Sequence, residues 1–329
     1  MAHFQPYPWH DAAWQRLTDL QSRQRLPHAL VLSGPAGTGK TALAESLAAL
    51  LFCAAPKDNK PCGGCKGCLL WKADTHPDCH RLTPLTDEKT GKTSKVIKVD
   101  QVRSLLGFLS KSAQLGGWRI AMIEPADTLN VNAANSLLKT LEEPGERTLI
   151  LLLTDQPLAL LPTIRSRCQT VPLGVPERAQ AVSWLASRLE TPEQAGLLLS
   201  LSQGAPLAGL ALAKQEVFRQ REDLAKRLLA VATGRSGALS ASTASQKLPA
   251  QDFWFWLYGF CADIHLMSSQ VQGAIKNTDL LPIIRQLADA LGGRRALELQ
   301  ALCVENQRLL TANIQAGLLQ DRFWEQTRG

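Results

Sequence analysis

The 329-residue sequence has no run of about eighteen uninterrupted apolar residues, the length that a membrane-spanning helix needs. Its first residues, "MAHFQPYPWHD", lack the basic start and the apolar stretch of a secretory signal peptide. Aromatic residues make up only 5% of the chain, against 45% hydrophobic and 20% charged residues. This composition excludes a disordered or fibrous chain and favours a mostly helical globular protein. Together these absences lead us to expect a cytoplasmic protein.

Acidic residues are outnumbered, with 29 Asp and Glu against 36 Lys and Arg and a formal net charge of +7. Most of the basic excess lies before position 173, notably in "KTGKTSKVIK" at 89–98. Such a balance permits contact with phosphate backbones without proving it, because surface lysines are usually only solvated. The length itself exceeds one ordinary core and predicts two or three domains.

One short segment has the pattern of a phosphate-binding loop. The apolar run "HALVLSG" (28–34) leads into "GPAGTGKT", and "ALAESLAALLF" continues with helical periodicity. Strand, glycine loop and helix thus follow in the order that G-x-x-x-x-G-K-T requires. Glycines let backbone N–H groups face a phosphate, the lysine reaches the β and γ phosphates, and the threonine can ligate magnesium. The alternative is a glycine turn before a core helix. The predicted phosphate-binding residues are Gly34, Gly37, Gly39, Lys40 and Thr41.

Three of the eight cysteines fall within "CGGCKGC" at 62–68, whose repeated C-x-x-C step suits tetrahedral coordination of a soft divalent metal. We predict a zinc ion held by Cys62, Cys65 and Cys68, with Cys53 as the fourth ligand. His76, Cys79 and His80 of "THPDCH" are rivals for that fourth position. A redox pair is the alternative, although a cytosolic protein with this spacing more often holds zinc. Four protein ligands would leave no open coordination position, so the metal is expected to be architectural.

Strands and helices alternate along the next part of the chain. The segments "RIAMIE" (119–124) and "TLILLLTD" (148–155) are predicted to be buried strands. A helix is predicted between them within "NVNAANSLLKTLEEPGE", where Pro144 ends it. The turn "LPTIRSRCQTVPL" (161–173) then leads into a short strand. This alternation predicts a parallel sheet covered by helices on both faces.

The remainder of the chain reads as helical. "PERAQAVSWLASRL" and "PEQAGLLLSLSQG" suit short helices, and "KQEVFRQREDLAKRLLAVATG" is a longer amphipathic helix that begins a further domain. The Gly, Ser and Ala-rich segment "GRSGALSASTASQK" (234–247) is predicted to be a loop. Trp254, Trp256 and Tyr258 are expected to pack in a core or subunit interface rather than to stack on bases.

In this order, "GPAGTGKT", the cysteine group, "NSLLKTLEEP" and "SRC" resemble the AAA+ clamp-loader subunits of bacterial DNA polymerase III. An intact phosphate loop combined with "IEPAD" is most similar to the delta-prime branch of that family. The resemblance is strong over residues 1–215, whereas the C-terminal third matches only in length and helical character. It implies an α/β RecA-like AAA+ ATPase domain with a parallel sheet and a zinc-binding knuckle (53–68) at 1–172. A small helical lid domain at 173–214 and an all-α collar domain at 215–329, which joins a ring of five subunits, would follow.

The resemblance also assigns roles at the nucleotide site. Glu124 stands where the motor subunits have a magnesium-associated Asp, and Pro125 stands where they have the catalytic Glu. Proline offers no proton acceptor, and loss of that base costs on the order of 10² to 10⁴ in rate; alternatively, Pro125 merely shapes a turn. Thr154 with Asp155 occupies the place of the γ-phosphate sensor, and Leu207 lies about where the lid usually has a sensing Arg. Asp127 is close enough in sequence to replace the missing acid, but we expect it to point elsewhere.

Arg167, the arginine of "SRC", is expected from the resemblance to lie at the subunit surface and enter the neighbour's ATP site. An arginine finger of this kind is worth roughly 10³ to 10⁵ in rate. The alternative is an arginine tied to a local carboxylate such as Glu142 or Glu143. Arg165 is a second candidate for the same role.

The resulting hypothesis is a non-motor clamp-loader subunit, with weak or absent ATPase activity of its own. It would bind ATP or ADP with Mg²⁺ weakly or statically, complete a neighbour's site and help to load the sliding clamp on primed DNA during replication. Its expected partners are the motor subunits (gamma/tau) and the delta subunit in a hetero-pentameric ring, with the sliding clamp and primer-template DNA reached through the complex. Two alternatives remain: an active P-loop ATPase, and a zinc-dependent nucleic-acid-binding module.

Overall fold

The computed structural model describes residues 4–86, 91, 93–94, 96–311 and 314–327. The chain divides into two compact units, Met1–Gln180 and Ala181–Gly329, and each has hydrophobic clusters of its own. Residues 89, 90, 92 and 95 of the basic segment, which we considered for DNA contact, lie outside the described residues. The predicted three-part division, with boundaries at 172 and 214, stays a prediction.

The first unit is built on a five-stranded parallel sheet in the order β2-β3-β4-β1-β5. Apolar residues make up most of the three central strands, all of whose residues are buried, as strands covered on both faces require. The register pairs Ser33 with Thr154 and Ile123 with Leu152, so the carboxyl ends of these central strands meet at one edge. The strands are β1 (Ala29–Ser33), β2 (Cys79–Leu82), β3 (Arg119–Ile123), β4 (Thr148–Thr154) and β5 (Gln169–Pro172).

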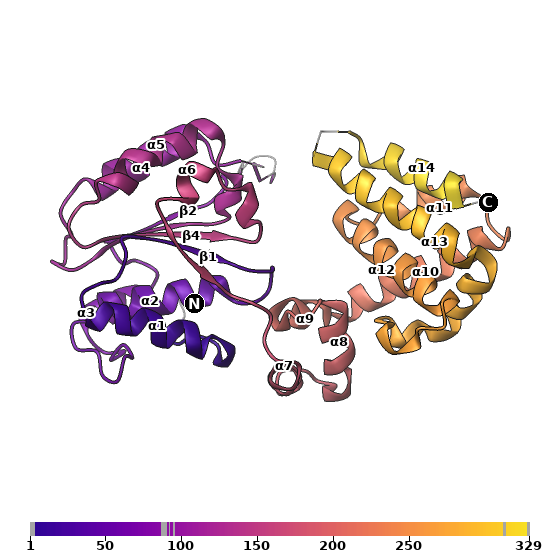
Figure 1. The fold of residues 1–329 in the computed structure, drawn as a ribbon, viewed down its shortest axis with the longest axis horizontal. Helices are drawn as coiled ribbons and strands as arrows, with labels where there is room; N and C mark the ends of the chain where they lie inside the picture. Colours follow the sequence, from indigo (N-terminus) through magenta and orange to yellow (C-terminus); the bar gives the residue numbers. More distant parts are fainter. Residues whose placement is uncertain (1–3, 87–90, 92, 95, 312–313, 328–329) are drawn as a thin grey trace. The chain divides into compact units, whose positions relative to one another are not determined.

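Helices cover both faces of the sheet (Figure 1). Leu30 and Leu32 point into a cluster with the helices of one layer, whereas Ala29 and Val31 point into a second cluster on the opposite face. The alternation of side chains along β1 thus contributes residues to two hydrophobic cores, one on each face of the sheet. The first layer holds α1 (Asp11–Ser22), α2 (Lys40–Phe52) and α3 (Lys66–Lys72), and the second holds α4 (Val99–Leu109), α5 (Val131–Glu142) and α6 (Pro162–Arg165).

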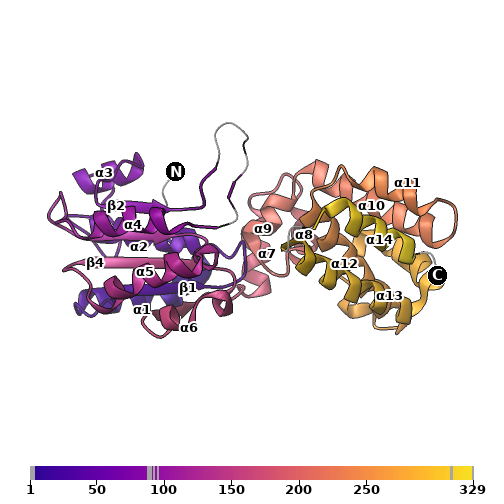
Figure 2. The same cartoon turned by 90° about the horizontal axis from the view of Figure 1, so that it is seen from above.

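The second unit is helical throughout its described residues and has no strand there. In α13, Gly292 has a φ of +69°, which breaks the helix into two segments. Helix α13 packs on α10, α12 and α14; Figure 2 labels these helices within the second unit. The helices are α7 (Arg178–Ala186), which spans the boundary, α8 (Ala195–Leu201), α9 (Pro206–Leu212), α10 (Gln215–Ala232), α11 (Ala238–Ser245), α12 (Ala250–Ser268), α13 (Leu281–Thr311) and α14 (Ala316–Thr327).

These elements confirm the predicted α/β fold with a parallel sheet and a helical C-terminal region. The predicted loop at 234–247 was wrong, because residues 238–245 form α11. The small side chains of Ala241 and Ser245 are buried there, and α11 packs on α14. Tertiary packing therefore outweighs a composition that is typical of loops. Trp254 and Trp256 are buried as expected, whereas Tyr258 is exposed.

Among the described residues, no single helix is both long and apolar enough to cross a membrane. Within the described part of the chain, one bent pair, Pro192–Leu201 with Pro206–Leu212, reaches that length and composition when taken together, and it bends by 112° at the break.

Candidate nucleotide and metal sites

The predicted phosphate loop connects β1 to α2 at the carboxyl edge of the sheet. Gly39 precedes the helix with a φ of +93°, in the left-handed region that favours glycine. A Cβ added there would lie 2.6 Å from the ring of Tyr7, so both the backbone angle and the available space require glycine. Gly37 also has a positive φ, and Gly34 begins the loop directly after β1. The loop thus has a conformation in which successive N–H groups can face a phosphate.

Lys40 begins α2 and is buried at 6% exposure. Its Nζ donates hydrogen bonds to the carbonyl oxygens of Gly34 and Pro35, both at 2.9 Å, and forms an ion pair with Asp155. A buried ammonium needs such partners, since an unpaired charge in this position would be costly. Asp155, which follows β4 directly, was named at the sensor position but not as a partner of the lysine.

The other predicted nucleotide residues gather at the same edge. The Thr41 hydroxyl donates to Glu124 Oε1 at 2.5 Å, and Thr154, 1% exposed, ends the neighbouring strand β4. The parallel register explains this meeting, because β1, β3 and β4 end side by side. A threonine and a carboxylate in contact are oxygen ligands of the kind that Mg²⁺ prefers.

Asp127 lies in this site, so the expectation that it points elsewhere was wrong. The Thr154 hydroxyl donates to Asp127 Oδ1 at 2.5 Å. The physical reason is local: β3 ends at Ile123, and Ala126–Thr128 form a 3₁₀ turn, in which the alternation of side chains along a strand no longer holds. Pro125, next to Glu124, is exposed and carries no acceptor on its side chain.

The N-terminal segment contacts the phosphate loop, which the sequence did not predict. Trp9 Nε1 donates to the carbonyl oxygen of Thr38 at 2.8 Å, and His10 Nε2 lies 2.9 Å from the same oxygen. Tyr7 stacks on Trp9 with ring centroids 4.8 Å apart. Burial lowers the pKa of His10 to about 4, with a smaller contribution from Lys40, although the Thr38 carbonyl and Asp11 oppose the shift. His10 is therefore neutral near pH 7 and donates through Nε2.

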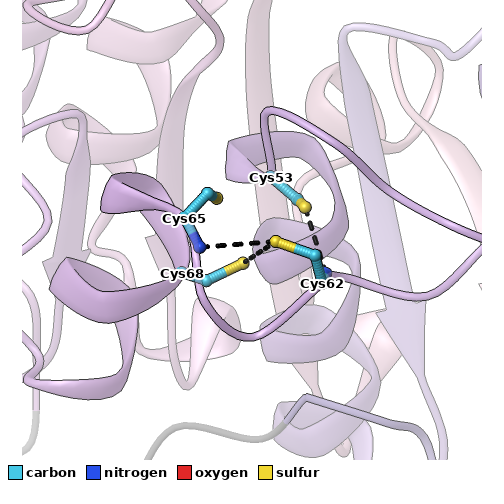
Figure 3. Close-up of side chains that lie close together, drawn as sticks. All are labelled: Cys53, Cys62, Cys65 and Cys68. Carbon is cyan, nitrogen blue, oxygen red and sulfur yellow. Dashed lines mark hydrogen bonds between the residues drawn. The ribbon is translucent and has the colours of Figure 1, made fainter.

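The four cysteines predicted as metal ligands come together where α2 meets α3 (Figure 3). Cys53 follows α2, Cys65 precedes α3 and Cys68 lies in its first turn. Together with Cys62, their sulfur atoms all lie within 4.8 Å of one another. Tetrahedral zinc with Zn–S distances of about 2.3 Å sets sulfur atoms about 3.8 Å apart, so this cluster could hold such an ion after a small contraction.

Gly67 explains how the two helices approach so closely. A Cβ added to Gly67 would lie 2.1 Å from the carbonyl oxygen of Phe52, the last residue of α2. Any other residue would push α3 away from the end of α2 and separate Cys68 from Cys53. The glycine inside "CGGCKGC" thus has a packing role that the C-x-x-C spacing alone did not reveal.

Hydrogen bonding and burial shift the pKa values of the four thiols in different directions. Burial opposes ionisation of Cys65, but hydrogen bonds from the backbone N–H groups of Ala54 and Cys68 and from neighbouring thiols lower its pKa to about 6. Backbone N–H groups likewise lower the pKa of Cys62, whereas burial raises the pKa of Cys53 and of Cys68. Ionisation is therefore easier for Cys62 and Cys65 than for Cys53 and Cys68, and four adjacent thiolates would need a cation to coexist.

The rival ligands lie in other surroundings. The His76 ring stacks on Phe52 at 3.6 Å between centroids, and its Nδ1 accepts from the N–H of Asp78. Cys79 and His80 lie in β2, and the His80 ring contacts Phe108. Among the described residues, only the four cysteines form a group of metal-ligand type. Strand β2, which contains few apolar residues, was not predicted from the sequence.

Arg167 follows α6 closely, and its side chain keeps 34% exposure. Its Nε donates to Glu142 Oε1 at 2.7 Å, its Nη2 also pairs with that oxygen, and its Nη1 donates to the Thr163 carbonyl at 3.0 Å. The local ion pair that we weighed as an alternative is thus present. It does not bury the arginine. Arg165 differs in that its Nε is buried with no partner among the described residues.

The first unit therefore has the architecture of an α/β domain with a P-loop-type glycine loop at the carboxyl edge of its parallel sheet, followed along the chain by a helical unit. A family model described as "DNA polymerase III, delta subunit" matches residues 9–177, and one described as "DNA polymerase III, delta subunit, C terminal" matches residues 215–322. The chain belongs to the DNA polymerase III delta' subunit family, which confirms the resemblance seen in the sequence.

Individual relatives agree with this assignment. The DNA polymerase III subunit delta' of Pseudomonas aeruginosa is 40% identical over 322 residues, covering 95% of this chain and 94% of that protein. The subunit delta' of Escherichia coli is 36% identical over 292 residues, covering 88% of this chain and 84% of that protein. Among solved structures, a DNA polymerase III gamma subunit-related protein from Thermotoga maritima has a TM-score of 0.50 at 17% identity, covering 95% of this chain and 98% of that chain, a likeness of fold alone.

The buried position of His10 predicts a pH-dependent stability. Its pKa in the folded chain, about 4, lies below the value of about 6.5 expected when unfolded. Between these values the unfolded chain binds a proton that the folded chain does not, so stability is full above about pH 6.5 and falls toward pH 4. Between pH 7 and pH 4 the free energy of unfolding should fall by about 1 to 3 kcal/mol less in His10→Gln than in the wild type. Urea unfolding from pH 7 to 4 measures it; His265→Gln in the second unit is the control, and equal slopes for wild type and His10→Gln would contradict the assignment.

Proposed function

We propose that this chain is the clamp-loader subunit that binds nucleotide with little turnover and completes a neighbour's ATP site with Arg167. The observation that carries the proposal is the arrangement of Thr41, Glu124 and Pro125 at the carboxyl edge of the sheet. Thr41 and Glu124, which contact each other, would hold a magnesium-bound phosphate, while the next position has no proton acceptor. Nucleotide can therefore be held without the base that activates water.

The residues present fit the triphosphate end of a nucleotide. The glycine loop would bind phosphate oxygens through its N–H groups, Lys40 would pair with the β and γ phosphates, and Thr154 would contact the γ phosphate. Bound Mg²⁺ would neutralise phosphate charge, with Thr41 as a ligand and Glu124 on a magnesium-bound water. In the present geometry Lys40 is engaged by Asp155 and two carbonyls, so a nucleotide must replace these contacts. Weak or static binding follows from that competition.

Asp127 supports the alternative of an active ATPase. Its carboxylate contacts Thr154 at the predicted γ-phosphate position, and it is a possible proton acceptor in the place of the missing glutamate. The Thr154 hydroxyl already occupies one oxygen of this carboxylate, and Asp127 lies three positions beyond Glu124 rather than next to it. We therefore favour poor hydrolysis, with Asp127 as the residue on which any turnover would depend.

Arg167 supports the trans-acting role because it is exposed and held in a defined place. In that role it would enter the ATP site of an adjacent motor subunit (gamma/tau), within a hetero-pentameric ring that also contains the delta subunit. Through that ring the chain would help to load the sliding clamp on primer-template DNA during replication. We place this activity in the cytoplasm.

Zinc at Cys53, Cys62, Cys65 and Cys68 is the second part of the proposal. The cluster has four sulfur donors and no fifth ligand among the described residues, which suits a closed structural site. Such an ion would join the end of α2 to the start of α3. The third hypothesis, a zinc-dependent nucleic-acid-binding module, has no supporting contact in the described residues.

The isolated chain is expected to bind ATP while turning it over about 10²- to 10⁴-fold more slowly than a motor subunit, because the base is missing. Equilibrium binding of labelled ATP and single-turnover hydrolysis measure the two properties. Lys40→Ala should lose binding, and Asp127→Asn should retain it. Turnover at motor-like rates that Asp127→Asn abolishes would instead establish the active-ATPase alternative.

Arg167→Ala in the reconstituted clamp loader should lower ATP hydrolysis at the neighbouring site by about 10³- to 10⁵-fold, as loss of an arginine finger does. Steady-state ATPase, with assembly checked by gel filtration, measures the effect. Arg165→Ala tests the rival arginine and should leave the rate near that of wild type. Unchanged hydrolysis in a fully assembled Arg167→Ala complex would exclude the trans-acting role.

The purified chain should contain one zinc ion, which elemental analysis can count. Cys53→Ser should lose it as Cys62→Ser does, because each removes one of four ligands. Cys79→Ser is the matched control, since Cys79 lies in β2 outside the cluster, and should retain zinc. The opposite pattern, with zinc kept in Cys53→Ser and lost in Cys79→Ser, would reassign the fourth ligand.

A further inference from the structure

Glu142 is the last residue of α5, and its carboxylate contacts the edge of the Arg167 guanidinium that carries Nε and Nη2. On the other side, Nη1 donates to the carbonyl of Thr163 in α6 and faces the Ser166 hydroxyl at 3.4 Å. The guanidinium is thus held between the end of one helix and the turn of another. A free arginine side chain would sample many rotamers, whereas this one has a fixed direction.

From this geometry we propose that Glu142 is a positioning residue for Arg167, which fixes the guanidinium before it meets the neighbour's phosphates. This inference rests on the trans-acting role proposed above for Arg167. Glu142 itself touches neither nucleotide nor reacting atoms in this scheme and acts only through the arginine.

Two physical arguments favour positioning over sequestration. First, both partners are substantially exposed, at 34% for Arg167 and 51% for Glu142, and an exposed ion pair is weak. A triphosphate carries more charge and accepts bidentate hydrogen bonds from arginine, so it is not excluded by Glu142. Second, the contact with Glu142 uses only the Nε and Nη2 side of a group that has five N–H donors. The Thr163 carbonyl takes one N–H of Nη1, so the second N–H of Nη2 and the N–H of Nη1 that faces Ser166 only at 3.4 Å can still donate to an incoming anion.

The position of Glu142 in the helix supports a lasting contact. A carboxylate at a helix C-terminus faces the negative end of the helix dipole, which is unfavourable unless a cation lies nearby. Arg167 supplies that cation. The neighbouring Glu143 is also exposed and has no ion pair with a described residue. The two adjacent glutamates of "LLKTLEEP" therefore differ in whether they pair with Arg167.

The test uses the reconstituted clamp loader and its steady-state ATPase. Glu142→Ala should lower kcat by about two- to tenfold, the effect of no longer immobilising one flexible side chain, with the KM for ATP unchanged. Glu142→Gln should recover part of the loss, because its amide oxygen still accepts from Nε. Glu143→Ala is the matched control and should behave as wild type. Thermal unfolding and gel filtration of each variant check folding and assembly.

The decisive measurement is the double variant Glu142→Ala/Arg167→Ala. If Glu142 acts through the arginine, the double variant should be no slower than Arg167→Ala alone, whereas a general structural role would add a further loss. A faster Glu142→Ala complex, or an equal loss in both backgrounds, overturns the inference. Normal activity of Glu142→Ala beside a slow Arg167→Ala also overturns it, yet leaves the proposed function intact. An Arg167→Ala complex that hydrolyses ATP at the wild-type rate would instead refute the proposed function itself.

Discussion

Parallel pairing of β1, β3 and β4 is the constraint on which the candidate nucleotide site depends. Because the three strands run in one direction and end in register, the glycine loop, Glu124 and Thr154 reach one edge although they are far apart in sequence. The same arrangement fixes the start of α2 at that edge. Helix α2 then runs through 13 residues, or about 20 Å, before it reaches Cys53. The cysteine cluster is thus remote from the phosphates, in agreement with an architectural role for any metal there.

Local signals made most of the first unit predictable. The central strands are continuous apolar runs, and the phosphate loop has a fixed spacing, so both could be identified from a few adjacent residues. Strand β2 could not, because "CHRL" is short and only its last residue is buried. Helix α11 was not predicted for a related reason, because its Ser and Ala residues form no periodic apolar face. Its helical state depends on packing against α14.

The site was predictable in its residue types but not in its contacts. The spacing of "GPAGTGKT" identified Lys40 and Thr41, and the cysteine spacing identified three of the four clustered thiols. No local pattern could pair Lys40 with Asp155, or place Trp9 and His10 on the Thr38 carbonyl, because these contacts join separate parts of the chain. Asp127 was misjudged since the strand ends just before it and a tight turn changes its direction.

One electrostatic arrangement recurs at both ends of the proposed catalytic scheme. Lys40 and Arg167 each have a dedicated carboxylate, and in each pair the carboxylate is the more exposed partner, at 47% for Asp155 and 51% for Glu142. A cation paired in this way is neither left uncompensated nor buried by its partner, because the exposed anion is well solvated. The two pairs differ in what an incoming phosphate would do. At Lys40 the phosphate would be that of the chain's own nucleotide and would replace Asp155, beside a position where proline offers no base, so binding would lead to little chemistry. At Arg167 the phosphate would belong to a neighbour that supplies its own base. Glu142 would stay in contact with the arginine there, and the phosphate would accept from the N–H groups that Glu142 leaves open, so the pair would contribute to catalysis.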